Sequence, residues 1–149
     1  MSQTPTEPSN PRPLTILLAE AGIGRSSLIR IVGVHGMPAL LWFCRHGFEQ
    51  VGYLRAGQAG PYEEADLVFV AQTCNRLDLY RLLEGGPQAR DGGALIFRLA
   101  RHSAEPQIDL GVATRLLARY GYAVERSLQG AHRSLFVARR QAQPSVRAA

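Results

Sequence analysis

The chain has 149 residues, a formal net charge of +5 at pH 7, and a hydrophobic share of 46%. This length suits one domain, and the apolar share is large enough for one core, which excludes a wholly disordered or fibrous protein. Its cations are all arginine. Because that bias is typical of a GC-rich coding sequence, we do not interpret single arginines as selected phosphate contacts.

The two cysteines, Cys44 and Cys74, show neither a disulfide framework nor a metal-ligand spacing. We therefore expect no metal site and a reducing, cytoplasmic setting. The longest apolar run covers residues 39–44, which is far shorter than the roughly 20 residues of a membrane-spanning helix. No membrane partner is expected.

The predicted elements alternate between helix and strand along most of the chain. Residues 1–13 and 141–149 are polar and are predicted to be disordered tails, which leaves one domain over residues 14–140. Its first half is predicted to hold a helix over 14–22, a strand over 28–34, a helix over 37–46 and a strand over 48–54. The alternation continues with a strand over 66–71, a helix over 77–83, a strand over 94–99 and a helix over 109–120.

The last two strands are predicted to pair with each other. They cover residues 122–128 and 133–139, and the short connection between them contains a glycine, which favours an antiparallel hairpin. The alternation before them is typical of parallel strands with crossover helices. The sequence therefore predicts an α/β fold, with a mainly parallel twisted sheet, helices on both faces and a C-terminal antiparallel hairpin.

Four short motifs accompany this order of elements. IVGVHG at 31–36 is a glycine-rich loop after the first strand, and ADLVFV at 65–70 is a buried strand. LLEGG at 82–86 with DGGALI at 91–96 is a glycine-rich turn into the next strand, and LLARYGY at 116–122 closes the last helix. Together with the terminal hairpin, they resemble the S-adenosylmethionine-dependent methyltransferases over roughly residues 28–140. The resemblance implies a Rossmann-like fold and S-adenosylmethionine as a candidate cofactor.

The chain departs from that family at the footholds of the cofactor. The family's glycine loop begins with an acidic residue, which this chain lacks before Gly33. The family also places a carboxylate at the end of the second strand, where this chain has YLR at 53–55 and no carboxylate before Glu63. Residues 55–65 are too few for the family's third strand with its helices, so one strand is predicted to be missing.

The candidate ligand contacts lie where strands end, because open α/β sheets bind ligands at the carboxyl ends of their strands. Gly33, His35 and Gly36 are the candidate cofactor contacts. Arg55 is either a contact to a nucleotide phosphate or an ordinary solvated residue. The segment after the third strand is either a substrate or ligand loop or the cap of the following helix; it comprises Gln72, Thr73, Cys74 and Asn75.

Several functions remain open at this point. The first is a methyltransferase-like domain with a degenerate cofactor site, acting as a non-catalytic binding, regulatory or oligomerising module. The second is a small active S-adenosylmethionine-dependent methyltransferase, and the third is a nucleotide-binding domain that uses Arg55. A homodimer or another protein partner is expected, with residues 41–43 (LWF) as either interface or core. A small-molecule ligand is a further candidate. Nucleic-acid binding is not expected, because the C-terminal arginines do not share one strand face.

Overall fold

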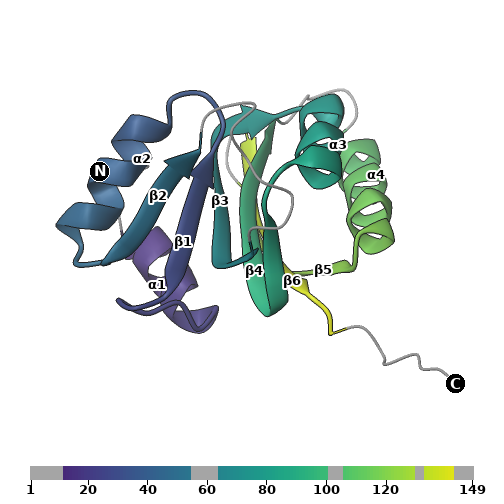
Figure 1. Cartoon of the computed structure of the whole chain (residues 1–149). Helices are drawn as coiled ribbons and strands as arrows, with labels where there is room; N and C mark the ends of the chain where they lie inside the picture. Colours follow the sequence, from purple (N-terminus) through teal and green to yellow (C-terminus); the bar gives the residue numbers. More distant parts are fainter. Residues whose placement is uncertain (1–11, 55–63, 101–105, 130–132, 143–149) are drawn as a thin grey trace, which may run out of the picture.

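The computed structural model describes residues 12–54, 64–100, 106–129 and 133–142, and the helices and strands follow the predicted order (Figure 1). The four helices are α1 (Arg12–Glu20), α2 (Gly36–Arg45), α3 (Arg76–Gly85) and α4 (Pro106–Arg119). The strands are β1 (Leu28–Val32), β2 (Gln50–Leu54), β3 (Glu64–Cys74), β4 (Gln88–Ala100), β5 (Tyr122–Gln129) and β6 (Arg133–Arg140). The predicted tails fall largely outside the described residues, although α1 already begins at Arg12.

All six strands form one sheet, in the order β2-β1-β3-β4-β6-β5. The pairs β1–β2, β1–β3 and β3–β4 are parallel, whereas β6 runs antiparallel to both β4 and β5. The predicted mainly parallel sheet with a closing hairpin is therefore confirmed. In the described part of the chain, no strand lies beyond β2, where the predicted missing strand would stand.

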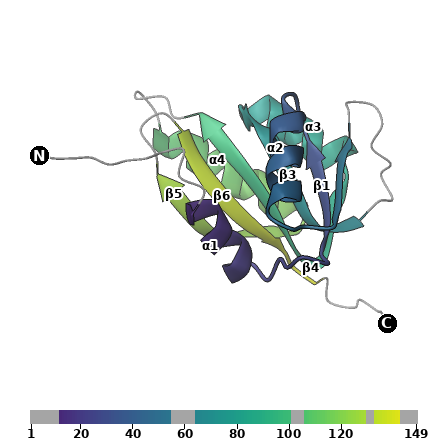
Figure 2. The same cartoon turned by 90° about the vertical axis from the view of Figure 1, so that its left-hand side faces the viewer.

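Helices cover both faces of the sheet, as predicted (Figure 2). On one face, Leu18 of α1 and Phe43 of α2 pack with Ile29 and Ile31 of β1. On the other face, α3 and α4 share a second apolar cluster with β3, β4 and β6. Burying apolar surface on both sides explains why the central strands read as almost continuous hydrophobic runs.

Strands β3 and β4 are longer than their apolar centres predict. Strand β3 continues to Cys74, where Thr73 pairs with Arg98 of β4. The sequence prediction ended this strand at Ala71, because the polar residues that follow resemble a loop. Strand β4 begins at Gln88, and the register of its pairing with β3 shifts across residues 91–93. The glycines predicted as a turn there therefore form an irregularity inside the strand.

Two C-terminal arginines are bound within the fold. Arg139 pairs with Glu125 at 2.7 Å and donates to the carbonyl oxygen of Gly92 at 2.7 Å. Arg140 donates to the carbonyl oxygen of Ala89 at 2.9 Å. Both guanidinium groups thus hold the hairpin to β4 and its surroundings.

Residues 41–43, which were predicted to be either interface or core, differ from one another in burial. Phe43 is fully buried and meets Phe69 edge to face at a centroid distance of 5.3 Å. Trp42 is half-buried and stacks on His46, and Leu41 is exposed. In the residues that the structure describes, no helix combines the length and the apolar character needed to cross a bilayer.

Candidate functional site

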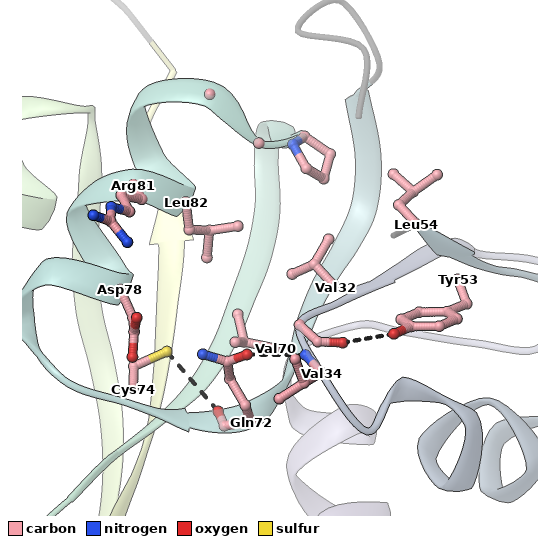
Figure 3. A pocket seen from close by; sticks show the side chains of 14 residues that line it. Val32, Val34, Tyr53, Leu54, Val70, Gln72, Cys74, Asp78, Arg81 and Leu82 are labelled. Atoms are coloured by element: carbon pink, nitrogen blue, oxygen red, sulfur yellow. Dashed lines mark hydrogen bonds between the residues drawn. The ribbon is translucent and has the colours of Figure 1, made fainter. Parts of the chain in front are cut away.

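The topology of the sheet places one crevice between β1 and β3. Helix α2, which follows β1, packs on one face, and α3, which follows β3, packs on the other. The two crossovers therefore leave the sheet in opposite directions at neighbouring parallel strands, which is where open α/β sheets bind ligands. A cleft of about 410 Å³ lies there, lined by the ends of β1, β2 and β3, by α3, and by residues 86–87 (Figure 3).

The floor of this cleft begins at the glycine turn between β1 and α2. Gly33 has a φ of +98° and His35 a φ of +63°, so both lie in the left-handed region. Glycine adopts this region at no steric cost, whereas a histidine there is uncommon. His35 precedes α2 as its N-cap residue, is exposed, and makes no capping hydrogen bond with its side chain.

Two side chains from neighbouring strands hold the polar groups of this turn. The Tyr53 hydroxyl of β2 donates to the Gly33 carbonyl oxygen at 2.9 Å. The Val34 backbone N–H donates to Oε1 of Gln72, on β3, at 2.9 Å. Both bonds are visible in Figure 3, where Gln72 lies between Cys74 and Val34. The turn is therefore braced from both sides by the protein itself.

Tyr53 also explains why a glycine stands at the start of α2. A Cβ atom built on Gly36 would lie 2.1 Å from Cε1 of the Tyr53 ring. Gly36 is buried, so the ring covers its Cα closely. The absence of a side chain at Gly36 therefore allows the Tyr53 ring to pack against the backbone.

The α3 wall of the cleft carries its charged side chains. Asp78 and Arg81 lie opposite Tyr53 and Leu54 in Figure 3. Asp78 accepts a hydrogen bond from the Asn75 N–H at 3.2 Å, and Oδ1 of Asn75 accepts one from the Asp78 N–H at 2.8 Å. This reciprocal capping box begins α3 and confirms the capping interpretation for Asn75.

Cys74 lines the cleft as a buried thiol. Burial and, to a smaller extent, the nearby Asp78 carboxylate raise its pKa from 9.0 to about 12, although Arg98 partly opposes them. A thiol with this pKa is protonated at neutral pH, and only the thiolate is a strong nucleophile. Nucleophilic chemistry by Cys74 is therefore not supported. Within the described residues, no group of three His, Cys, Asp or Glu side chains gathers to hold a metal.

The structure brings some of the predicted site residues together and separates others. Gly33, Gln72 and Cys74 line the cleft, whereas His35 and Gly36 do not. Gln72, Thr73 and Cys74 belong to strand β3, so the predicted ligand loop is wrong in its conformation. Arg55 lies outside the described residues.

Tyr53, Asp78 and Arg81 line the cleft with polar or charged groups but are not among the predicted site residues. The sequence singles out Tyr53 only as a position without the expected carboxylate, and it does not mark Asp78 or Arg81 as site residues. The feature of the sequence that could have indicated Tyr53 as a lining residue is its place at the end of a strand beside the crevice. The register sets Tyr53 against Ile31, and the bond from its hydroxyl to Gly33 shows that its side chain reaches the glycine turn.

No protein-family model and no curated protein sequence matches the chain. Its fold is nevertheless similar to that of solved methyltransferases. The ribosomal protein L11 methylase from Lactobacillus delbrueckii subsp. bulgaricus superimposes with a TM-score of 0.63 at 11% identity, covering 87% of this chain and 78% of that one.

Magnesium protoporphyrin IX methyltransferase from Synechocystis PCC 6803 with bound SAH superimposes with a TM-score of 0.59 at 11% identity, covering 87% and 81% of the two chains. A methyltransferase from Pyrococcus furiosus gives a TM-score of 0.56 at 15% identity and covers 93% and 88%. At these identities the likeness concerns the fold. The chain has the Rossmann-like fold of S-adenosylmethionine-dependent methyltransferases, as its sequence motifs predicted.

Proposed function

We propose that the chain is a methyltransferase-like domain with a degenerate cofactor site, which serves as a non-catalytic binding or regulatory module. The observation that carries this proposal is the braced glycine turn. Gly33 and Val34 already have partners in Tyr53 and Gln72, and Gly36 is covered by the Tyr53 ring.

A ligand that used this turn would have to replace those internal contacts. Each hydrogen bond broken costs about 0.5 to 1.5 kcal/mol unless the ligand restores it. Since every 1.4 kcal/mol corresponds to about tenfold in affinity, displacing both Tyr53 and Gln72 weakens binding by about fivefold to about a hundredfold. A turn built to receive a cofactor would leave these backbone groups open.

The charges of the cleft support the same proposal. The family resemblance implies a carboxylate at the end of β2, but Tyr53 and Leu54 stand at that place. Among the described residues that line the cleft, Asp78 is the one carboxylate, and it is engaged in the cap of α3. The described residues therefore do not fit the ribose hydroxyls of S-adenosylmethionine.

The second candidate is a small active methyltransferase. It is favoured by the position of the cleft at the switch point and by its volume of about 410 Å³, which is within the range of small-molecule sites. A similar fold, that of the Synechocystis enzyme, holds SAH. In this alternative, Tyr53 and Gln72 would have to move when the ligand enters.

Calorimetric titration with S-adenosylhomocysteine distinguishes the two candidates. The Synechocystis enzyme serves as the positive control in the same buffer. The proposal expects no saturable heat from this chain at up to about 1 mM ligand, which sets its affinity below that of a working site. Micromolar binding that is lost in a Gly33→Val variant with an unchanged circular dichroism spectrum would contradict the degenerate site and favour the enzyme.

Homodimerisation stays a prediction. Val34, Met37 and Leu41 are exposed, and the latter two lie one turn apart on α2. The solution mass by light scattering at tens of micromolar checks it, and a dimer mass is the expected result. A monomer mass would contradict the prediction.

A further inference from the structure

A second cavity lies on the outer surface of α3 and α4, away from the cleft. The two helices contact each other and cover the same face of the sheet (Figure 1). A groove of about 750 Å³ runs between them. It shares no lining residue with the cleft at the ends of β1 and β3.

The groove has an apolar floor. Leu77 and Tyr80 come from α3, and Val112 and Leu116 come from α4. Each pair is spaced three or four residues apart, so its members share one face of their helix. Leu77 is 52% exposed and Tyr80 is 41% exposed. Large apolar side chains that lie open in a groove with a polar rim are typical of interaction sites.

The rim of the groove is basic. It consists of Arg76 on α3 and of Arg115 and Arg119 on α4. Within the described part of the chain, none of these three guanidinium groups forms an ion pair. Arg115 and Arg119 are four residues apart, and like charges at this spacing destabilise an isolated helix by about 0.2 to 0.5 kcal/mol. An anion between them would reverse that effect.

The acidic side chains of α3 have other partners than this rim. Asp78 is held in the helix cap by Asn75. Glu84 accepts a hydrogen bond from the Tyr120 hydroxyl at 2.9 Å, and this bond raises the pKa of Tyr120. Among the described residues, neither carboxylate forms an ion pair with an arginine of the rim.

We propose that this groove binds an acidic amphipathic segment of a partner protein, with apolar side chains on the floor and carboxylates against the arginines. The chain's own ends lack this chemistry, because residues 1–11 contain a single acidic residue, Glu7, and residues 143–149 contain none. The floor favours a peptide over a nucleic acid, because it is mostly aliphatic and bases stack on aromatic rings, of which it offers only Tyr80. The inference does not depend on the proposed function, because cleft and groove are separate.

The test uses fluorescence anisotropy of a labelled, designed peptide of about four helical turns, with leucine on one face and glutamate elsewhere. A scrambled peptide of the same composition and a labelled oligothymidine are the comparison probes. The designed peptide is expected to bind saturably, and more tightly than both comparison probes.

Two pairs of variants separate the groove from general charge effects. Arg119→Glu is matched by Arg45→Glu, because each arginine lies in the last turn of its helix. Leu77→Ala is matched by Leu41→Ala, because both leucines are exposed on helices. Arg119→Glu should weaken peptide binding about tenfold, and Leu77→Ala about fivefold. The control variants Arg45→Glu and Leu41→Ala should weaken it by less than about twofold.

Three results would overturn the proposal. The first is no saturable binding of the designed peptide at up to about 200 µM. The second is an equal loss of binding in Arg119→Glu and Arg45→Glu, which would indicate attraction by net charge alone. The third is tighter binding of the oligothymidine that depends on Arg119 and not on Leu77, which would assign the groove to nucleic acid.

Discussion

Replacing Gly36 by alanine is expected to lower the free energy of unfolding by about 2 to 3 kcal/mol, which is the usual cost of overpacking a tight site. The added Cβ would lie 2.1 Å from Cε1 of Tyr53, and no side chain tolerates that distance without moving. Gly36 opens α2 and has no positive φ. Alanine there would otherwise favour the helix by about 0.5 to 1 kcal/mol, so the loss measures the clash with the ring.

A double-mutant cycle isolates that clash. In a Tyr53→Ala background the ring is absent, so Gly36→Ala should be neutral or stabilising, and the two changes should couple by about 2 kcal/mol or more. In a Tyr53→Phe background the ring remains, and Gly36→Ala should stay destabilising. Tyr53→Phe by itself should cost about 1 kcal/mol, for the lost bond to the Gly33 carbonyl.

Urea unfolding followed by the fluorescence of Trp42, the one tryptophan of the chain, measures each free energy. The denaturant dependence should be equal among the four proteins of the cycle, so that differences in midpoint report stability. Additive effects of Gly36→Ala and Tyr53→Ala within about 0.5 kcal/mol would refute the reasoning, because the ring would then not cover Gly36.

Four further predictions concern helix capping, a buried hydrogen bond, thiol accessibility and protonation. Asn75→Ala should cost about 1 kcal/mol in urea unfolding by breaking the capping box of α3, whereas Asn75→Asp should keep most of it; equal losses would contradict the cap. Tyr122→Phe should cost about 1 to 3 kcal/mol, because the buried Ala89 N–H donates to its hydroxyl at 3.0 Å, and a cost below about 0.5 kcal/mol would contradict that bond. A disulfide reagent at pH 8 should modify the exposed Cys44 quickly and Cys74 only on unfolding; equal rates would contradict the burial of Cys74. The pKa of Cys74 is raised from 9.0 to about 12 in the folded protein, mainly by burial, so the unfolded chain loses this proton first as pH rises. The wild-type protein should therefore lose stability relative to Cys74→Ala between pH 9 and 10, by at most about 1.4 kcal/mol.

Local patterns were enough to predict most of the fold. The connection predicted over residues 129–132 is too short for a crossover, which predicts the antiparallel pairing that β5 and β6 show. The apolar centre of β3 predicts a strand buried on both faces. The ends of β3 and β4 could not be predicted in this way, because polar residues interrupt the apolar run after Ala71 and residues 91–93 (DGG) are of types that favour turns. Pairing between the two strands decides their conformation.

The candidate site was predicted only in its position. The switch point follows from the order of elements, and Gly33 follows from the glycine loop. The bonds that brace the turn join residues about 20 and 38 positions apart, Tyr53 with Gly33 and Gln72 with Val34. No short pattern encodes such contacts, so the sequence did not show which groups of the turn are already bonded.

The most direct test of the proposed degenerate site observes the turn itself. Backbone amide NMR signals of Gly33 and Val34 should keep their chemical shifts when S-adenosylhomocysteine is added to about 1 mM, because Tyr53 and Gln72 retain their bonds to the turn. Saturable shifts of these two signals at micromolar ligand, together with loss of the Tyr53 hydroxyl contact, would contradict the account and show that the turn receives the cofactor.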